Sequence, residues 1–135
     1  MNTLEGVLRK EKIRLYSFPD IAALTNFPCK AYACSYIGNE KDGLLNVATE
    51  KKIPEKYLFM YGGKFIGIFS SVEVYGMGMR GSSDILCRIT DIIRKHELEY
   101  KMTSVCERGI IFIMKREDAQ LLYDKICAEF RISFG

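Results

Sequence analysis

Hydrophobic and polar positions form a clear pattern in the second half of the 135-residue chain. Residues 64–75 are rich in β-branched and aromatic side chains, which predicts a long, mostly buried strand. Apolar side chains recur every three to four positions over residues 85–93, which predicts an amphipathic helix. The later segments predict a strand, a buried strand, a helix and a short closing strand at residues 98–103, 109–114, 119–130 and 131–134.

This succession of elements, β-α-β-β-α-β, predicts an α+β fold of the ferredoxin-like type. In that fold two helices cover one face of a four-stranded antiparallel sheet. The other face and the sheet edges need cover, so we expect pairing with another copy or with the first half of the chain.

The first half is less regular and is punctuated by proline and glycine. Its apolar pattern predicts a helix at residues 4–11, interrupted by Gly6, and a hairpin at residues 57–61. Strands are expected at residues 12–18, 30–37 and 44–49. We therefore expect two domains, a degenerate strand-rich half at residues 1–63 and a complete unit at residues 64–135.

Composition and length exclude several classes of protein. The chain is 48% hydrophobic and 27% charged, which is ordinary for a globular domain. Its length leaves no room for a doubly wound dinucleotide fold plus a substrate domain, or for an α/β barrel. The net charge of +3 arises entirely from residues 1–64 and is too small to indicate a nucleic-acid or membrane partner.

Cysteine and histidine usage argues against a metal site or a nucleophilic catalyst. The five cysteines are odd in number and lack metal-knuckle spacing, so free thiols in a reducing cytoplasm are expected. His96 is the single histidine and lies near the predicted end of a helix. No signal pattern begins the chain, and no apolar run approaches a membrane span. The sequence thus predicts a protein without catalytic residues, cofactor or metal.

The glycine-rich segment Gly76-Met77-Gly78-Met79-Arg80-Gly81 lies between a predicted strand and a predicted helix. It has the GxGxxG spacing of a dinucleotide site, but the strand at residues 98–103 leads into a hairpin and not into a second crossover. Its glycines nevertheless allow close backbone approach to a ligand, and free N–H groups at the helix start attract a carboxylate or phosphate. A tight turn that binds nothing is the alternative.

Residues 74–130 resemble an ACT domain of the kind found at the C-terminus of aspartokinases. The resemblance lies in the glycine- and methionine-containing loop, in Glu107-Arg108-Gly109 before an apolar strand, and in a last helix with Glu117-Asp118-Ala119 and Glu129-Phe130. Asp84 and Gly109 depart from the residues usual in the family. The whole chain resembles small stand-alone proteins with tandem ACT domains, the first of them degenerate.

This resemblance implies a non-catalytic regulatory protein that binds a small effector, usually an amino acid, at an interface between paired domains. A homodimer or an intrachain pair of ACT domains would supply that interface. The α-carboxylate would bind near Ser82 and Ser83, and Asp84 or backbone carbonyls would take the ammonium group. The alternative role of Asp84 is a helix N-cap. The implied effector contacts are Gly78, Met79, Arg80, Gly81, Ser82, Ser83, Asp84, Met102, Thr103 and Ser104.

An RNA-binding module is the competing interpretation, because the RNA-recognition fold has the same order of elements. Residues 108–113 partly match its third-strand signature, but Ile110 stands where an aromatic ring is expected. Since base stacking requires such rings, we expect no nucleic-acid partner.

Overall fold

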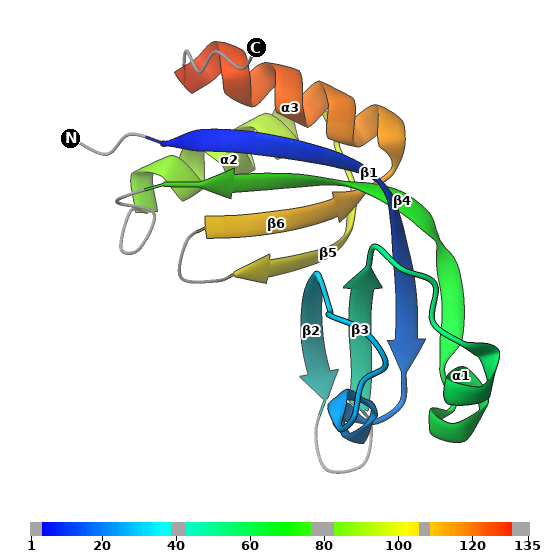
Figure 1. The fold of residues 1–135 in the computed structure, drawn as a ribbon. Helices are drawn as coiled ribbons and strands as arrows, with labels where there is room; N and C mark the ends of the chain where they lie inside the picture. The colour runs from blue at the N-terminus through cyan, green and yellow to red at the C-terminus, as the bar shows by residue number, and fades with distance from the viewer. Residues whose placement is uncertain (1–3, 39–42, 77–82, 106–108, 131–135) are drawn as a thin grey trace. The chain divides into compact units, whose positions relative to one another are not determined.

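A computed structural model of the chain describes residues 4–38, 43–76, 83–105 and 109–130. The strands are β1 (Gly6–Phe18), β2 (Ala33–Gly38), β3 (Gly43–Thr49), β4 (Lys64–Tyr75), β5 (Tyr100–Val105) and β6 (Gly109–Met114). The helices are α1 (Glu55–Tyr61), α2 (Ser83–Lys95) and α3 (Arg116–Phe130), with a short 3₁₀ turn at Ile21–Leu24. The described strands are hydrogen-bonded in the order β2-β3-β1-β4-β6-β5 (Figure 1).

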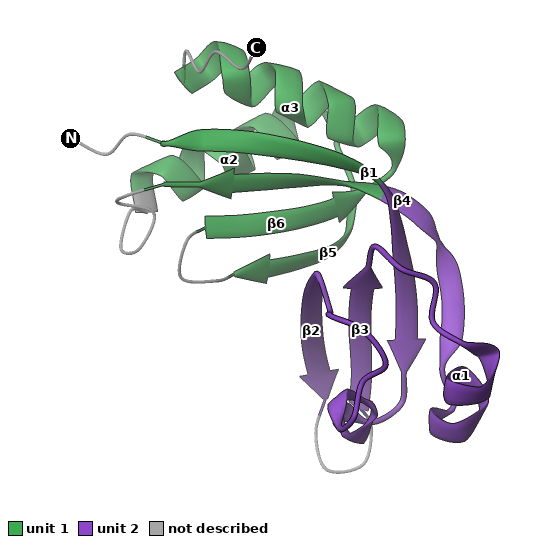
Figure 2. Cartoon of the chain, in the orientation of Figure 1, with its two compact units in different colours: residues 1–11, 70–135 green, residues 12–69 purple. Residues whose placement is uncertain are grey.

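The chain divides into two compact units (Figure 2). Unit 1 contains residues 1–11 and 70–135, and unit 2 contains residues 12–69. The boundaries fall inside β1 and β4, so both strands belong partly to each unit. The sequence had placed the division between residues 63 and 64.

Unit 1 contains the predicted sheet with its two helices, α2 and α3, on one face (Figure 1). Strand β6 pairs antiparallel with β4 on one side and with β5 on the other. Arg88 of α2 connects the helices through a 3.0 Å ion pair with Glu129 of α3. The buried core beneath them consists of Val7, Val72, Val74, Ile85, Ile89, Leu98, Ile110, Phe112, Met114, Ala119, Leu122 and Ile126.

The beginning of β1 is a strand, and the predicted helix at residues 4–11 is wrong. The Glu5 amide donates to the Tyr75 carbonyl at 3.1 Å, and Val7 is buried in the core of unit 1. Glycine is a poor helix former, so Gly6 favours this extended pairing beside β4. In the strand order, β1 lies next to β4. In a ferredoxin-like sheet, the predicted closing strand would take that place. That predicted strand, residues 131–134, lies outside the described residues.

Unit 2 has its own core beneath the β2-β3-β1 strands. The rings of Phe18, Phe27 and Tyr57 contact one another edge to face, with centroids 5.6 to 6.4 Å apart. Residues 57–61 belong to α1, so the predicted hairpin there is wrong. This helix starts directly after Pro54 and ends at Gly62, whose φ of 68° provides the left-handed turn that closes a helix.

Candidate functional site

The structure describes only some of the predicted effector contacts in the segment that leads into α2. Gly78, Met79, Arg80, Gly81 and Ser82 lie outside the described residues, and Ser83 is the first residue of α2. Asp84 is exposed in the first turn of that helix. Its carboxylate therefore lies where the helix dipole favours negative charge.

The structure separates the three predicted residues of β5 onto two faces of the sheet. Thr103 is aligned with Phe112, whose side chain packs in the core beneath the helices. Met102 and Ser104 are aligned with Ile113 and Ile111, which point to the opposite face because successive strand residues alternate. Met102 is only 4% exposed. Of the three, Thr103 alone lies on the helix side.

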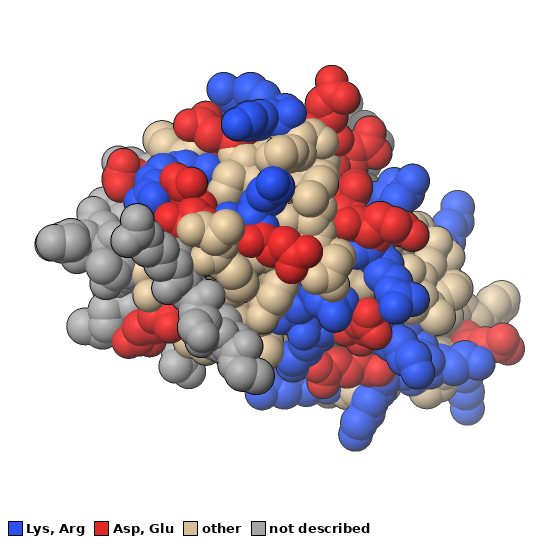
Figure 3. Space-filling model, turned by 90° about the horizontal axis from the view of Figure 1, so that it is seen from above, with Lys and Arg blue, Asp and Glu red and all other residues tan. Residues whose placement is uncertain are grey.

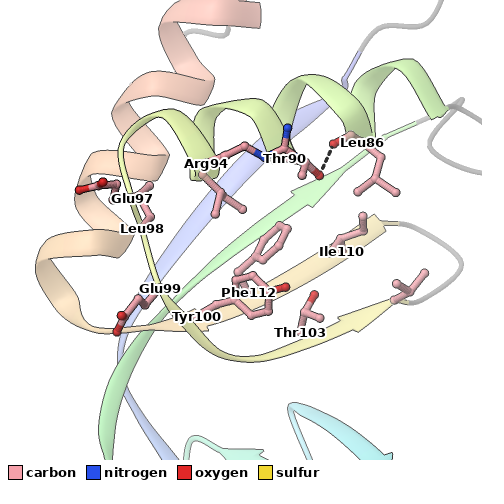
Figure 4. A pocket seen from close by; sticks show the side chains of 12 residues that line it. Leu86, Thr90, Arg94, Glu97, Leu98, Glu99, Tyr100, Thr103, Ile110 and Phe112 are labelled. Atoms are coloured by element: carbon pink, nitrogen blue, oxygen red, sulfur yellow. Dashed lines mark hydrogen bonds between the residues drawn. The ribbon is translucent and has the colours of Figure 1, made fainter.

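Thr103 lines a groove between α2 and the edge strand β5, with a volume of about 610 Å³ (Figure 4). Helix α2 contributes one stripe, since Leu86, Thr90 and Arg94 recur every four residues. The complete lining is Leu86, Thr90, Ile93, Arg94, Glu97, Leu98, Glu99, Tyr100, Thr103, Val105, Ile110 and Phe112.

The floor of this groove is apolar. Ile110 and Phe112 are 6% and 5% exposed, and the Tyr100 ring meets the Phe112 ring edge to face with centroids 5.8 Å apart. The Thr90 hydroxyl donates to the Leu86 carbonyl at 2.8 Å, so its proton is already used within α2 (Figure 4).

Charged groups occur at the margin of the groove. The carboxylates of Glu97 and Glu99 point away from the interior (Figure 4). Among the described residues of the lining, Arg94 is the one cation, and its guanidinium pairs with Asp91 at 3.8 Å. Arg94 was not among the predicted site residues, although its position four residues after Thr90 and eight after Leu86 is readable in the sequence.

A second, more polar hollow of about 400 Å³ lies between α2 and α3. The Arg88 guanidinium lies 4.2 Å from the centroid of the Phe130 ring and is paired with Glu129. Lys95 and Lys125 also line this hollow. The Arg88 guanidinium in this hollow is thus already engaged by Glu129 and Phe130.

The titratable side chains of the described residues do not gather into a metal site. No group of three or more His, Cys, Asp or Glu side chains in this part of the chain could hold a metal ion. Among the described cysteines, Cys29, Cys87 and Cys127 are free thiols. Burial raises the pKa of Cys29 and of Cys127, which opposes thiolate formation.

Within the described ranges, no helix is both long and apolar enough to cross a membrane.

Comparison with known proteins gives a match in structure and none in sequence families. No family model matches the chain, and no curated protein matches its sequence. The regulatory subunit of aspartate kinase from Thermus flavus superposes with a TM-score of 0.75 at 12% identity, covering 96% of this chain and 99% of that one. Aspartate kinase from Clostridium acetobutylicum gives 0.75 at 13% identity over 96% of this chain and 35% of its own.

Aspartokinase III from E. coli, in complex with lysine and aspartate, gives a TM-score of 0.57 at 10% identity. It covers 94% of this chain and 33% of the enzyme. These likenesses confirm the predicted α+β fold and the predicted resemblance to aspartokinase regulatory domains at the level of fold.

Proposed function

We propose that this chain is a regulatory module that binds a free amino acid and performs no catalysis itself. The observation that carries the proposal is the match of fold to a regulatory subunit over nearly the full length of both chains. The E. coli structure in complex with lysine and aspartate supports an amino acid as the effector class.

The proposed binding site combines the glycine-rich segment before α2 with Thr103 on β5. The first N–H groups of α2 have no partner within the helix and attract a carboxylate. Asp84, exposed in the first turn, would bind the ammonium group of the effector or stabilise the helix start.

A thermal-shift screen of the twenty amino acids, starting with lysine and aspartate, tests this proposal. A ligand at a hundred times its dissociation constant stabilises the fold by about 2.7 kcal/mol, which raises the melting temperature by several degrees. Gly81→Val should remove the shift, because a side chain there blocks backbone approach. The absence of a shift with every amino acid would refute the proposal.

Two conservative variants separate the roles of Asp84. If Asp84 binds the ammonium group, Asp84→Asn should lower the affinity for the amino acid. If Asp84 serves only as a helix cap, asparagine can replace it and the affinity should not change. Asp91→Asn is the matched control, because Asp91 is an exposed acid on the same helix at a distance from the loop.

RNA binding is the alternative, and the position of the signature strand weighs against it. Phe112, the aromatic residue of segment 108–113, is buried in the core beneath the helices and is therefore not available for stacking. Acidic and basic side chains alternate over the face drawn in Figure 3. A short RNA should therefore cause no melting shift, and salt-sensitive RNA binding would favour the alternative.

We also propose that the protein self-associates through its sheet edges. Strands β2 and β5 end the strand order and carry exposed apolar side chains, with Ile37 at 72% and Val105 at 76% exposure. Sedimentation should show a dimer, and Val105→Lys or Ile37→Lys should weaken it. A monomer at all concentrations would refute self-association.

A further inference from the structure

We propose that the outer face of α1 binds the surface of anionic lipid bilayers, with Phe59 and Met60 inserted among the lipid headgroups. This surface belongs to unit 2, whereas the proposed amino-acid site belongs to unit 1. The proposal therefore does not depend on amino-acid binding.

Helix α1 turns two large apolar side chains away from the core of unit 2. Tyr57, Leu58 and Tyr61 pack against that core. At about 3.6 residues per turn, Phe59 and Met60 fall on the opposite side of the helix. Phe59 is 92% exposed, the highest value among the large apolar side chains of the described residues, and Met60 is 64% exposed. Because a surface helix normally carries polar side chains there, this pattern indicates a contact surface.

Phe65 extends this apolar surface onto β4. Figure 2 shows α1 beside the first residues of β4, and only Gly62, Gly63 and Lys64 separate the helix from Phe65 in the chain. The Phe65 ring contacts the Tyr16 ring, with centroids 5.4 Å apart, and Tyr16 belongs to the core against which α1 packs. Phe65 thus lies on the same side of the strands as α1, and it is 51% exposed.

Lysines accompany these apolar side chains in the sequence. Residues 51–64 contain one acid and four lysines, and all four lysines are exposed: Lys51, Lys52, Lys56 and Lys64. This local excess equals the net charge of +3 of the whole chain. A charge that is small when averaged over 135 residues is therefore concentrated in the segment that contains α1.

This combination of charge and apolar exposure favours an anionic bilayer as the partner. Large apolar side chains among lysines are typical of segments that lie in the membrane interface. The negative surface potential of anionic lipids attracts the lysines, while the apolar side chains leave water. A second copy of α1 would bring its own Lys56 and Lys64 against the same charges, which disfavours a symmetric contact between copies.

Vesicle sedimentation with the full chain tests the charge preference. Vesicles of phosphatidylcholine with about one-third phosphatidylglycerol should bind the protein with half-saturation at about 0.1 mM lipid, and pure phosphatidylcholine should bind it about tenfold more weakly or less. Lys56→Gln should weaken binding to the anionic vesicles about fivefold. Lys125→Gln removes the same charge from an exposed position on α3 and is the matched control, with an expected change below about twofold.

Tryptophan fluorescence tests the insertion of α1. The chain contains no tryptophan, so Phe59→Trp places a single reporter on the proposed surface. Its emission should shift to shorter wavelength with anionic vesicles, and lipids brominated on their acyl chains should quench it. Leu86→Trp, at a 43% exposed position on α2, is the control and should show neither change. Phe59→Ser should keep the fold by circular dichroism and weaken vesicle binding about tenfold, because it removes an inserted apolar side chain.

Several results would overturn the proposal. These are equal binding to neutral and anionic vesicles, equal loss in Lys56→Gln and Lys125→Gln, unchanged emission of the Phe59→Trp variant, or no binding at about 1 mM lipid. A dimer that Phe59→Ser dissociates, without vesicle binding, would assign this face to a contact between copies and would equally overturn it. None of these measurements includes an amino acid, so failure here is distinguishable from failure of the proposed function.

Discussion

Glu97 closes helix α2 in a backbone conformation that suits glycine better than glutamate. Its φ is 52°, in the left-handed region. Its amide donates to the Arg94 carbonyl at 3.2 Å, and the Leu98 amide donates to the Ile93 carbonyl at 2.9 Å. This pair of bonds is the Schellman motif, whose left-handed position is usually glycine.

The expected gain from Glu97→Gly follows from two opposing costs. The left-handed conformation costs a residue with a β-carbon roughly 1–2 kcal/mol. Glycine loses more backbone entropy on folding, which costs roughly 0.5–1 kcal/mol relative to alanine. Glu97→Gly should therefore be about 0.5–1 kcal/mol more stable than Glu97→Ala, which removes the same charge but keeps the β-carbon.

Thermal unfolding followed by circular dichroism measures this difference. With an unfolding entropy of about 2.1 cal/mol/K per residue and 135 residues, 1 kcal/mol corresponds to roughly 3–4 °C. Glu97→Gly should thus melt about 2–4 °C above Glu97→Ala. Equal melting temperatures for the two variants would refute the assignment of strain to this position.

Three further predictions concern unit 1. Gly109→Ala should destabilise the protein by about 2–3 kcal/mol in urea unfolding, because a β-carbon there would overlap the backbone of β4. A urea midpoint equal to that of the unmodified chain would contradict this prediction. Leu122→Ala should lower the free energy of unfolding by about 2–5 kcal/mol, because Leu122 is fully buried in the core. Leu121→Ala, at a partly buried position, should lower it clearly less, and equal losses in the two variants would contradict the packing. Iodoacetamide at pH 8 should label exposed Cys87 faster than partly buried Cys127, because burial raises the pKa of the Cys127 thiol. The labelling rate of Cys127 should keep rising above pH 9, and equal rates for the two cysteines by mass spectrometry would refute this prediction.

Elements with strong local periodicity were predictable from the sequence. Strands β4 and β6 have the predicted bounds, and α2 and α3 cover the predicted helical stretches. Each of these segments carries its own pattern, with a period of two or a continuous apolar run for strands and 3.6 for helices. Apolar residues on one face of α2 therefore predicted Ile85 and Ile89 as core.

Segments whose structure depends on a distant partner were not predictable in this way. Residues 6–11 are a strand because they lie beside β4, and the pattern of these few residues does not reveal that pairing. The short helix α1 follows Pro54 and stops at Gly62, but its seven residues are too few for a clear period.

The candidate site shows the same division between local and tertiary information. The sequence alone identified a glycine-rich segment before a helix, and Met102, Thr103 and Ser104 on the strand after that helix. Strand alternation already implied that Thr103 faces away from Met102 and Ser104. Only the pairing of Thr103 with Phe112 shows that the Thr103 face is the one under the helices. The groove joins residues 86–94 to residues 103–112 across the sheet edge, so only the packing of α2 on β5 and β6 could bring its lining residues together.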